Sequence, residues 1–325
     1  MVVPTGFKSF PLPIAQLSLA AVLKCGQSFR WTAYPLNNIG DPATDSGAEK
    51  LDSEFIAPTH EYRLALKDRV VCLRQDEEAL FYRSVFPVSN ETTMNVTSTA
   101  KPKVEAESEN ANDKDEETLA WLKDYFQLEV DLLKLYSEWS KKDVVFRDTV
   151  KDRFAGIRIL RQDPWENVVS CVLHHLIAFG LIMVSRFICS SNNHIGRITK
   201  MVQSLCTEFS PTLCTIQDDA GTTTYYAFPS PKQLSHPSVA PKLRELGFGY
   251  RAEYVQRTAE MLCSEHKDPE AYLLSLRHKS EKEAREELLK LCGVGPKVAD
   301  CVLLMSLDKR NVVPGIIFQN SRLRY

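Results

Sequence analysis

The chain has 325 residues, of which 44% are hydrophobic and 25% are charged, a globular composition long enough for two domains. Its net charge of −2 excludes a protein coated in positive charge. The charge is uneven, because residues 105–117 carry seven acidic side chains and one lysine. From residue 141 onward 26 Lys and Arg exceed 20 Asp and Glu, which is compatible with nucleic-acid binding.

The first 90 residues predict strands, most clearly at 62–66 and 70–73, where apolar residues alternate or cluster. Residues 88–117 are polar and acidic, and we interpret them as a disordered insertion. From Thr118 onward the apolar spacing is helical. We therefore expect an α+β protein, with an N-terminal antiparallel β domain at 1–135 and a mostly α-helical domain at 136–325.

A helix start is predicted at Asp163-Pro164, with Asp as the N-cap and Pro in the first turn. The segment that follows at 171–186 is almost entirely apolar. The segment is too short for a confident membrane span. A membrane-anchored protein is therefore only a minor alternative, and we expect no association with a membrane. His174 and His175 would face different sides of a helix and make no metal pair. We interpret 171–186 as a buried or surplus segment.

Nine cysteines occur, none of them in a Cys-x-x-Cys pair. With no signal peptide visible, this favours a reducing intracellular compartment. Residues 1–20 carry Lys8 as their one cation, so a strong mitochondrial transit peptide is not visible. We expect a nuclear location, with the mitochondrion as the alternative.

The sequence Leu-Cys-Gly-Val-Gly-Pro-Lys at 291–297 predicts a helix-hairpin-helix element. Gly293 and Gly295 permit a tight turn with positive φ or a close backbone approach, and Pro296 stands where a new helix begins. The start of such a helix can bind a phosphate through its backbone N–H groups. An ordinary corner between two helices is the alternative.

Lys297 lies just inside this second helix, among apolar residues. Partial desolvation and the positive end of the helix dipole both favour the neutral amine, which is the nucleophilic form. Such an amine could attack C1′ of a deoxyribose, displace the base and leave a Schiff base. A surface lysine that contacts phosphate is the alternative.

Five motifs make the sequence resemble the eukaryotic 8-oxoguanine DNA glycosylase/AP lyases, most closely the fungal form, within the helix-hairpin-helix glycosylase superfamily. The resemblance covers most of residues 15–40 and 118–314, interrupted by the apolar segment. The motifs are Gly26 to Trp31, Arg161 to Glu166, Phe187 to Asn193, Leu243 to Ala252 and Gly293 to Cys301.

The resemblance implies roles at the base that is to be removed. Lys297 matches the lysine that forms the Schiff base, and Cys301, one helical turn later, matches the residue that packs against the extruded base. Gly26 matches the glycine whose carbonyl accepts the N7–H found only on the oxidised base. The chemistry implied needs no metal or organic cofactor, although a cation at the hairpin turn would help to hold the backbone against phosphate.

The resemblance also implies contacts with the duplex. Asn192 matches the residue that fills the gap left by the flipped nucleotide, and Tyr250 matches the wedge that buckles the duplex. Arg197 and Arg251 match the residues that read the opposite cytosine. Taken singly, these residues are more typical of a capping asparagine, a core tyrosine and solvated arginines.

Two departures limit the resemblance. The family's aspartate, nineteen residues past the lysine, is Ile316 here, and the helices that follow it are expected to be absent. That carboxylate would help to deprotonate the lysine and stabilise the developing positive charge on the sugar. The second departure is the segment 171–186. We interpret this segment and the tail at 315–325 as translated introns or gene-model errors.

The sequence therefore predicts a monomeric base-excision repair enzyme acting on damaged double-stranded DNA. It would remove 8-oxoguanine opposite cytosine through a Schiff base on Lys297 and then cleave the abasic site by β-elimination. The alternative is a catalytically silent DNA-binding homologue, because the aspartate position is Ile316 and the terminal helices are missing.

Overall fold

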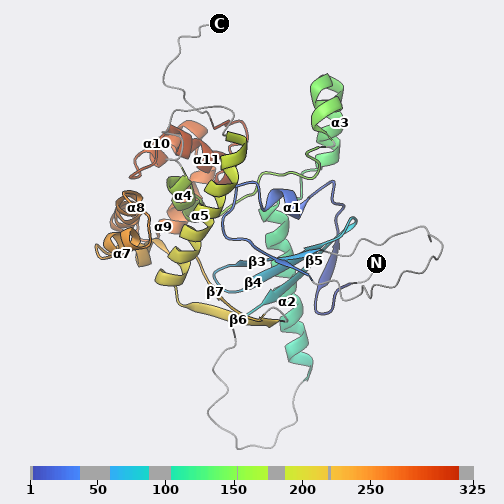
Figure 1. The fold of residues 1–325 in the computed structure, drawn as a ribbon, viewed down its shortest axis with the longest axis horizontal. Helices are drawn as coiled ribbons and strands as arrows, with labels where there is room; N and C mark the ends of the chain where they lie inside the picture. Colours follow the sequence, from blue (N-terminus) through green and yellow to red (C-terminus); the bar gives the residue numbers. More distant parts are fainter. Residues whose placement is uncertain are drawn as a thin grey trace, which may run out of the picture. The chain divides into compact units, whose positions relative to one another are not determined.

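The chain divides into two compact units in the computed structural model (Figure 1). The residues described are 3–36, 59–87, 104–151, 153–174, 187–218 and 221–314. Unit 1 comprises Met1–Lys24, Trp31–Arg158 and Leu213–Tyr225, and unit 2 comprises Cys25–Arg30, Ile159–Thr212 and Tyr226–Tyr325. An antiparallel sheet precedes a helical region along the chain, so the predicted α+β class is confirmed.

Unit 1 is built on a five-stranded antiparallel sheet with the order β1-β5-β4-β3-β2. Its strands are β1 (Lys8–Pro11), β2 (Thr32–Pro35), β3 (His60–Ala65), β4 (Val70–Gln75) and β5 (Ala79–Val85), and the short helix α1 (Leu19–Val22) follows β1. The strands predicted at 62–66 and 70–73 are confirmed as β3 and β4. Pairs such as Leu64 with Val71 and Ala65 with Val70 fix the register between them.

Two later segments also belong to unit 1. The strands β6 (Thr212–Asp218) and β7 (Gly221–Tyr226) form a separate two-stranded sheet. Arg63 on β3 donates to the Tyr225 hydroxyl at 3.2 Å and pairs with Asp218 at 2.6 Å. Helix α3 (Leu132–Lys142) and the π-helical turn η2 (Phe146–Val150) are also part of this unit. Residues 136–158 and 213–225 thus group with unit 1, whereas the sequence analysis placed the division at 135/136. Ile216 and Tyr225 of the later segment share a core cluster with residues of the sheet.

Helix α2 (Val104–Tyr125) occupies part of the segment predicted to be disordered. The prediction for 88–117 was wrong for 104–117, and residues 88–103 lie outside the described part. Two acidic side chains of α2 have basic partners from the sheet region: Asp115 pairs with Lys8 at 2.9 Å, and Glu117 with Arg69 at 3.0 Å. Leu122, near the end of the helix, is fully buried. These long-range contacts give an acidic segment partners that its composition does not reveal.

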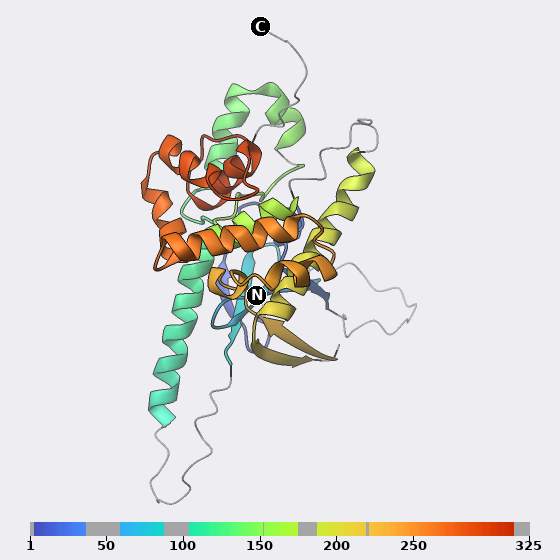
Figure 2. The same cartoon turned by 90° about the vertical axis from the view of Figure 1, so that its left-hand side faces the viewer.

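Unit 2 is helical (Figure 2). Its helices are α4 (Pro164–His174), α5 (Phe187–Phe209), α6 (Pro231–Leu234), α7 (Val239–Glu245), α8 (Arg251–Glu265), α9 (Pro269–Ser275), the 3-10 turn η4 (Leu276–His278), α10 (Glu281–Leu289) and α11 (Pro296–Ser306). Helix α4 begins as predicted, with Asp163 accepting from the Glu166 N–H at 2.9 Å. It packs against α8, α9 and α11, and this packing forms the core of the unit.

The apolar segment at 171–186 was expected to be buried or surplus, and its first three residues are buried. Helix α4 continues to His174, and Cys171, Val172 and Leu173 are buried in the core of unit 2. These residues are integral to the packing because they extend the apolar face of α4. The remainder of the segment, 175–186, lies outside the described residues. Within the described part of the chain, no helix has the length and apolarity to cross a membrane.

Candidate active site

The predicted hairpin is formed by α10 and α11 with a turn between Leu289 and Pro296. Gly293 has a φ of +81°, and a Cβ built there would lie 2.8 Å from the ring of Tyr254. Both the left-handed backbone and the close approach therefore require glycine. Gly295 differs, because its φ of −92° is accessible to other residues.

Gly295 is the N-cap of α11, and Pro296 occupies the first turn. The Gly295 carbonyl accepts from the Ala299 N–H at 2.9 Å, which starts the helical ladder. Glycine has no side chain to accept from the N–H groups of the first turn. A helix start of this kind, with the positive end of its dipole, is suited to binding a phosphate.

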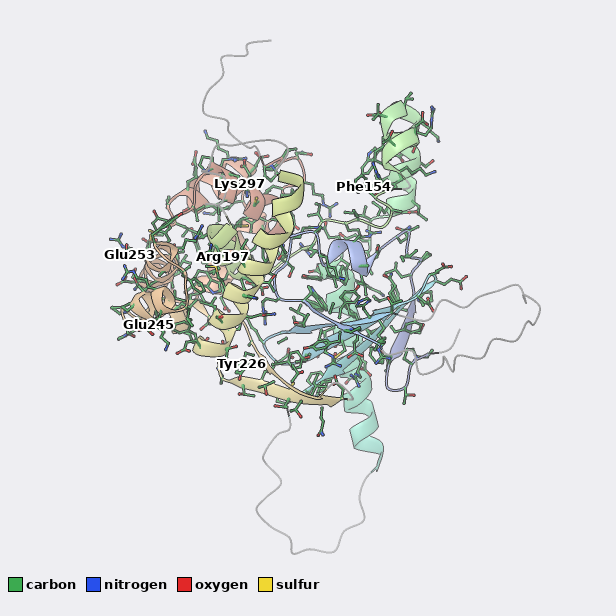
Figure 3. The ribbon with its side chains drawn as sticks, in the orientation of Figure 1. Phe154, Arg197, Tyr226, Glu245, Glu253 and Lys297 are labelled. Atoms are coloured by element: carbon green, nitrogen blue, oxygen red, sulfur yellow. The ribbon has the colours of Figure 1, made fainter. Side chains whose placement is uncertain are left out.

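Lys297 lies in the first turn of α11 (Figure 3) and is half-buried. Cys301 is buried one turn later. A hydrogen bond from Cys171 on α4 lowers the pKa of the Cys301 thiol, and the charge of Lys297 lowers it further, against the opposing effect of burial. The pKa of Cys171 is raised by the same bond and by burial. Lysine and two thiols thus form one cluster where α4 meets α11.

The far end of α11 is held by polar contacts. The Asn167 amide of α4 donates to the Ser306 hydroxyl at 2.7 Å, and both residues are buried. Arg161 donates to both oxygens of Asp308, at 2.8 and 2.5 Å. Arg277 donates to the Ser306 carbonyl at 2.7 Å. Asp308 is therefore engaged in a structural ion pair.

Gly26 lies in a loop that is fastened to other parts of unit 2. The Gln27 side chain accepts from the Leu160 N–H at 3.0 Å, and its carbonyl accepts from the Gln162 amide at 2.8 Å. Arg30 pairs with Glu166 at 2.9 Å. Burial raises the pKa of Glu166, and the Arg30 charge opposes this shift. These contacts fix the backbone on which Gly26 lies.

The backbone of Gly26 is in the left-handed region, with φ +85°, and a Cβ there would lie 3.3 Å from Ile195 on α5. Arg197 lies two residues beyond Ile195 and its side chain is exposed (Figure 3). Gly26, a predicted base-recognition residue, therefore lies close to α5, the helix that carries Arg197.

Tyr250 and Arg251 stand at the start of α8. Tyr250 is 49% exposed, and the Arg251 guanidinium lies over its ring at 5.1 Å from the centroid. The Arg251 Nε atom is buried and has no hydrogen-bond partner among the described residues. An exposed aromatic ring at this position is suited to contact a flat ring on a ligand.

Comparisons with known proteins match this architecture. The family model described as 8-oxoguanine DNA glycosylase, N-terminal domain, matches residues 9–168. The model described as HhH-GPD superfamily base excision DNA repair protein matches residues 185–314. The chain therefore carries an 8-oxoguanine DNA glycosylase N-terminal domain followed by an HhH-GPD domain.

Curated relatives agree with these two matches. The chain is 36% identical over 309 residues to the N-glycosylase/DNA lyase of Saccharomyces cerevisiae, covering 92% of the chain and 65% of that protein. It is 38% identical over 193 residues to the N-glycosylase/DNA lyase OGG1 of Arabidopsis thaliana, covering 59% of the chain and 47% of that protein. The chain thus spans less than two thirds of the length of these relatives.

Solved structures share the fold. A structure of MBOgg1 in complex with a low-affinity DNA ligand superposes with a TM-score of 0.61 and 25% identity, covering 97% of this chain and 82% of that chain. The Clostridium acetobutylicum 8-oxoguanine glycosylase/lyase, in complex with DNA containing cytosine opposite 8-oxoG, superposes with a TM-score of 0.59 and 24% identity. The match covers 92% of this chain and 76% of that chain.

All predicted site residues with described side chains lie in unit 2. Asn192 lies within α5, but its side chain is outside the described part, as is Ile316. Three contributors were missed by the sequence reasoning: Cys171, Tyr254 and Thr258, whose hydroxyl donates to the Cys292 carbonyl in the hairpin turn at 2.8 Å. Cys171 falls in the segment interpreted as buried or surplus, and the other two are ordinary helix residues, so no local signal distinguishes them.

Proposed function

We propose that this chain is a bifunctional DNA glycosylase and AP lyase that removes 8-oxoguanine opposite cytosine, using Lys297 as the nucleophile. The observation that carries the proposal is the half-buried lysine in the first turn of α11, directly after a glycine turn. The names of the relatives and the two family matches support the same activity.

The chemistry follows from an amine beside a phosphate-binding helix start. The neutral amine of Lys297 attacks C1′, and the bond from C1′ to the base nitrogen breaks with its electron pair, so that the base leaves and takes up a proton. The sugar ring opens to a Schiff base on the lysine. Loss of a C2′ proton then expels the 3′ phosphate, which is the lyase step. No organic cofactor takes part.

Recognition is assigned to three places. The Gly26 carbonyl is the acceptor for the N7–H of the oxidised base, and Cys301 packs against that base. Tyr250 wedges into the duplex, Arg197 and Arg251 face the opposite cytosine, and Asn192 fills the vacated position.

The DNA backbone lies against Gly293 and Gly295, where a cation would assist. The expected partner is damaged double-stranded DNA, bound by a monomer, and the expected location is the nucleus.

A second candidate is a DNA-binding homologue without catalysis. Ile316 favours it, because the family aspartate that would deprotonate the lysine is replaced by an apolar residue. The duplex contacts would be retained, since they need neither this carboxylate nor the lysine's nucleophilicity.

Borohydride trapping separates the two candidates. The full chain is incubated with a duplex containing 8-oxoguanine opposite cytosine, with an undamaged duplex of the same sequence as the control. We expect a covalent adduct with the damaged duplex alone. Specific binding to the damaged duplex with no adduct would support the silent homologue, and no binding to either duplex would contradict both.

A further inference from the structure

Three residues of α8 form a stripe that runs from the surface to the hairpin turn. Tyr250, Tyr254 and Thr258 are spaced four residues apart, so they share one face of the helix. The Tyr250 ring is half exposed, the Tyr254 ring is partly buried, and Thr258 is only 2% exposed. The rings of Tyr250 and Tyr254 meet edge to face with centroids 5.8 Å apart.

The two inner members of this stripe contact the turn that precedes Lys297. The Thr258 hydroxyl donates to the Cys292 carbonyl at 2.8 Å. The Tyr254 ring lies so close to Gly293 that a Cβ at that glycine would be 2.8 Å from both Cγ and Cδ2 of the ring. In Figure 2, α8 (orange) passes beneath α10 and α11 (red), which is consistent with these contacts.

We propose that Tyr254 and Thr258 are positioning residues that lock the hairpin turn to α8, so that the duplex contact at Tyr250 and the amine of Lys297 keep a fixed separation. This inference rests on the proposed function for its catalytic consequence. Its structural part, the locking of the turn, stands on the two contacts alone.

The physical reason lies in the shortness of the connection. Lys297 is five residues beyond Cys292, and the intervening glycines give the backbone little stiffness of its own. A turn that is released from α8 can shift the lysine relative to a duplex that is held at Tyr250. Misplacement of a reacting group by 1 Å costs about 10²-fold in rate.

The decisive variant is Thr258→Val, which keeps the shape of the side chain and removes the donor to Cys292. Thr207→Val is the matched control, because the Thr207 hydroxyl on α5 also donates to a backbone carbonyl, that of Gln203 at 3.0 Å, but on an exposed helix surface. Tyr254→Leu removes the ring over Gly293, and Tyr254→Phe keeps it.

Three quantities are measured on the full chain: the single-turnover rate constant of borohydride trapping, the active fraction from its amplitude, and hydrogen exchange of residues 291–297. In Thr258→Val and Tyr254→Leu we expect the rate constant to fall about tenfold and exchange at the turn to rise about tenfold. The affinity for the duplex should change less than about threefold, and Thr207→Val and Tyr254→Phe should match the unmodified chain.

A purely structural role would lower the active fraction while leaving the rate constant and the exchange of the turn unchanged, and that result would overturn the inference. Should Tyr254→Leu fail to fold, Thr258→Val decides. An unmodified chain that binds the duplex without forming an adduct would end the proposed function. Hydrogen exchange would then still decide the locking: faster exchange confined to the turn supports it, and unchanged exchange overturns it.

Discussion

The two ends of α11 differ in how the protein uses its polar groups. At the N-terminal end a glycine N-cap, a glycine turn and Lys297 leave the helix start able to meet a ligand. At the C-terminal end Ser306 and Asp308 are bonded to Asn167, Arg161 and Arg277. The C-terminal end is thus anchored by buried and ion-paired contacts, whereas the proposed function places the chemistry at the N-terminal end.

The largest expected effect is at the N-terminal end. Lys297→Gln removes the nucleophile, so the trapping rate should fall by at least about 10³-fold, with little change in melting temperature. Lys309→Gln is the matched control beyond the other end, where Lys309 donates to the Arg277 carbonyl at 2.8 Å. Equal loss in both variants, measured by single-turnover trapping, would break the distinction between the ends.

Gly293→Ala should have the next largest effect. A side chain at this φ is strained by about 1–3 kcal/mol, and the new Cβ would also overlap the Tyr254 ring at 2.8 Å. Gly247→Ala is the control, because Gly247 has a nearly equal φ of +85° with nothing within 4 Å. The free energy of unfolding by denaturant and the affinity for the duplex should both fall more in Gly293→Ala than in Gly247→Ala. Equal losses in the two variants would contradict the close approach of Tyr254 to Gly293.

Ser306→Ala tests the anchored end. It leaves the buried Asn167 amide without its 2.7 Å acceptor, which should lower the free energy of unfolding by about 1–3 kcal/mol. The trapping rate constant per active molecule should stay unchanged. Ser264→Ala, at an exposed serine of α8 that donates to the Met261 carbonyl, should cost far less. A slower rate constant in Ser306→Ala would show that the two ends are not separable.

The smallest effect is a pH dependence at α10. Hydrogen bonds from Lys290, Tyr272 and Lys279 lower the pKa of Glu287 to about 2, against a smaller effect of burial. Because the folded-state pKa is depressed, this stabilisation is present above the unfolded value and is lost as the pH falls from about 4.3 towards 2. Glu287→Gln should reduce the loss of unfolding free energy over this pH range by about 1 kcal/mol, because solvent partly screens the site. An identical decline in the variant, measured by acid unfolding, would contradict this assignment.

Local patterns predicted the hairpin, because its key residues lie within five positions of the chain: Gly293, Pro296 and Lys297. Each of them has a conformational or chemical preference of its own. The same holds for the helix start at Asp163. The contact between Thr258 and Cys292 joins residues 34 apart in the chain, and that between Asn167 and Ser306 joins residues 139 apart. No periodicity or propensity encodes such pairs.

The error at α2 has the same origin. Acidic composition indicates disorder when the charges have no partners, yet Asp115 and Glu117 meet Lys8 and Arg69 once the sheet has formed. Cys171 is a related case, because the sequence left 171–186 as either buried or surplus, and only the packing of α4 against α11 shows that Cys171 belongs to the core.

The most direct test of the account is to locate the covalent bond. After borohydride trapping on the duplex with 8-oxoguanine opposite cytosine, the adduct is digested and its modified residue is identified by mass spectrometry. The account predicts a single modified side chain, Lys297. Modification at another lysine such as Lys200, Lys290 or Lys309, with Lys297 unmodified, would contradict it.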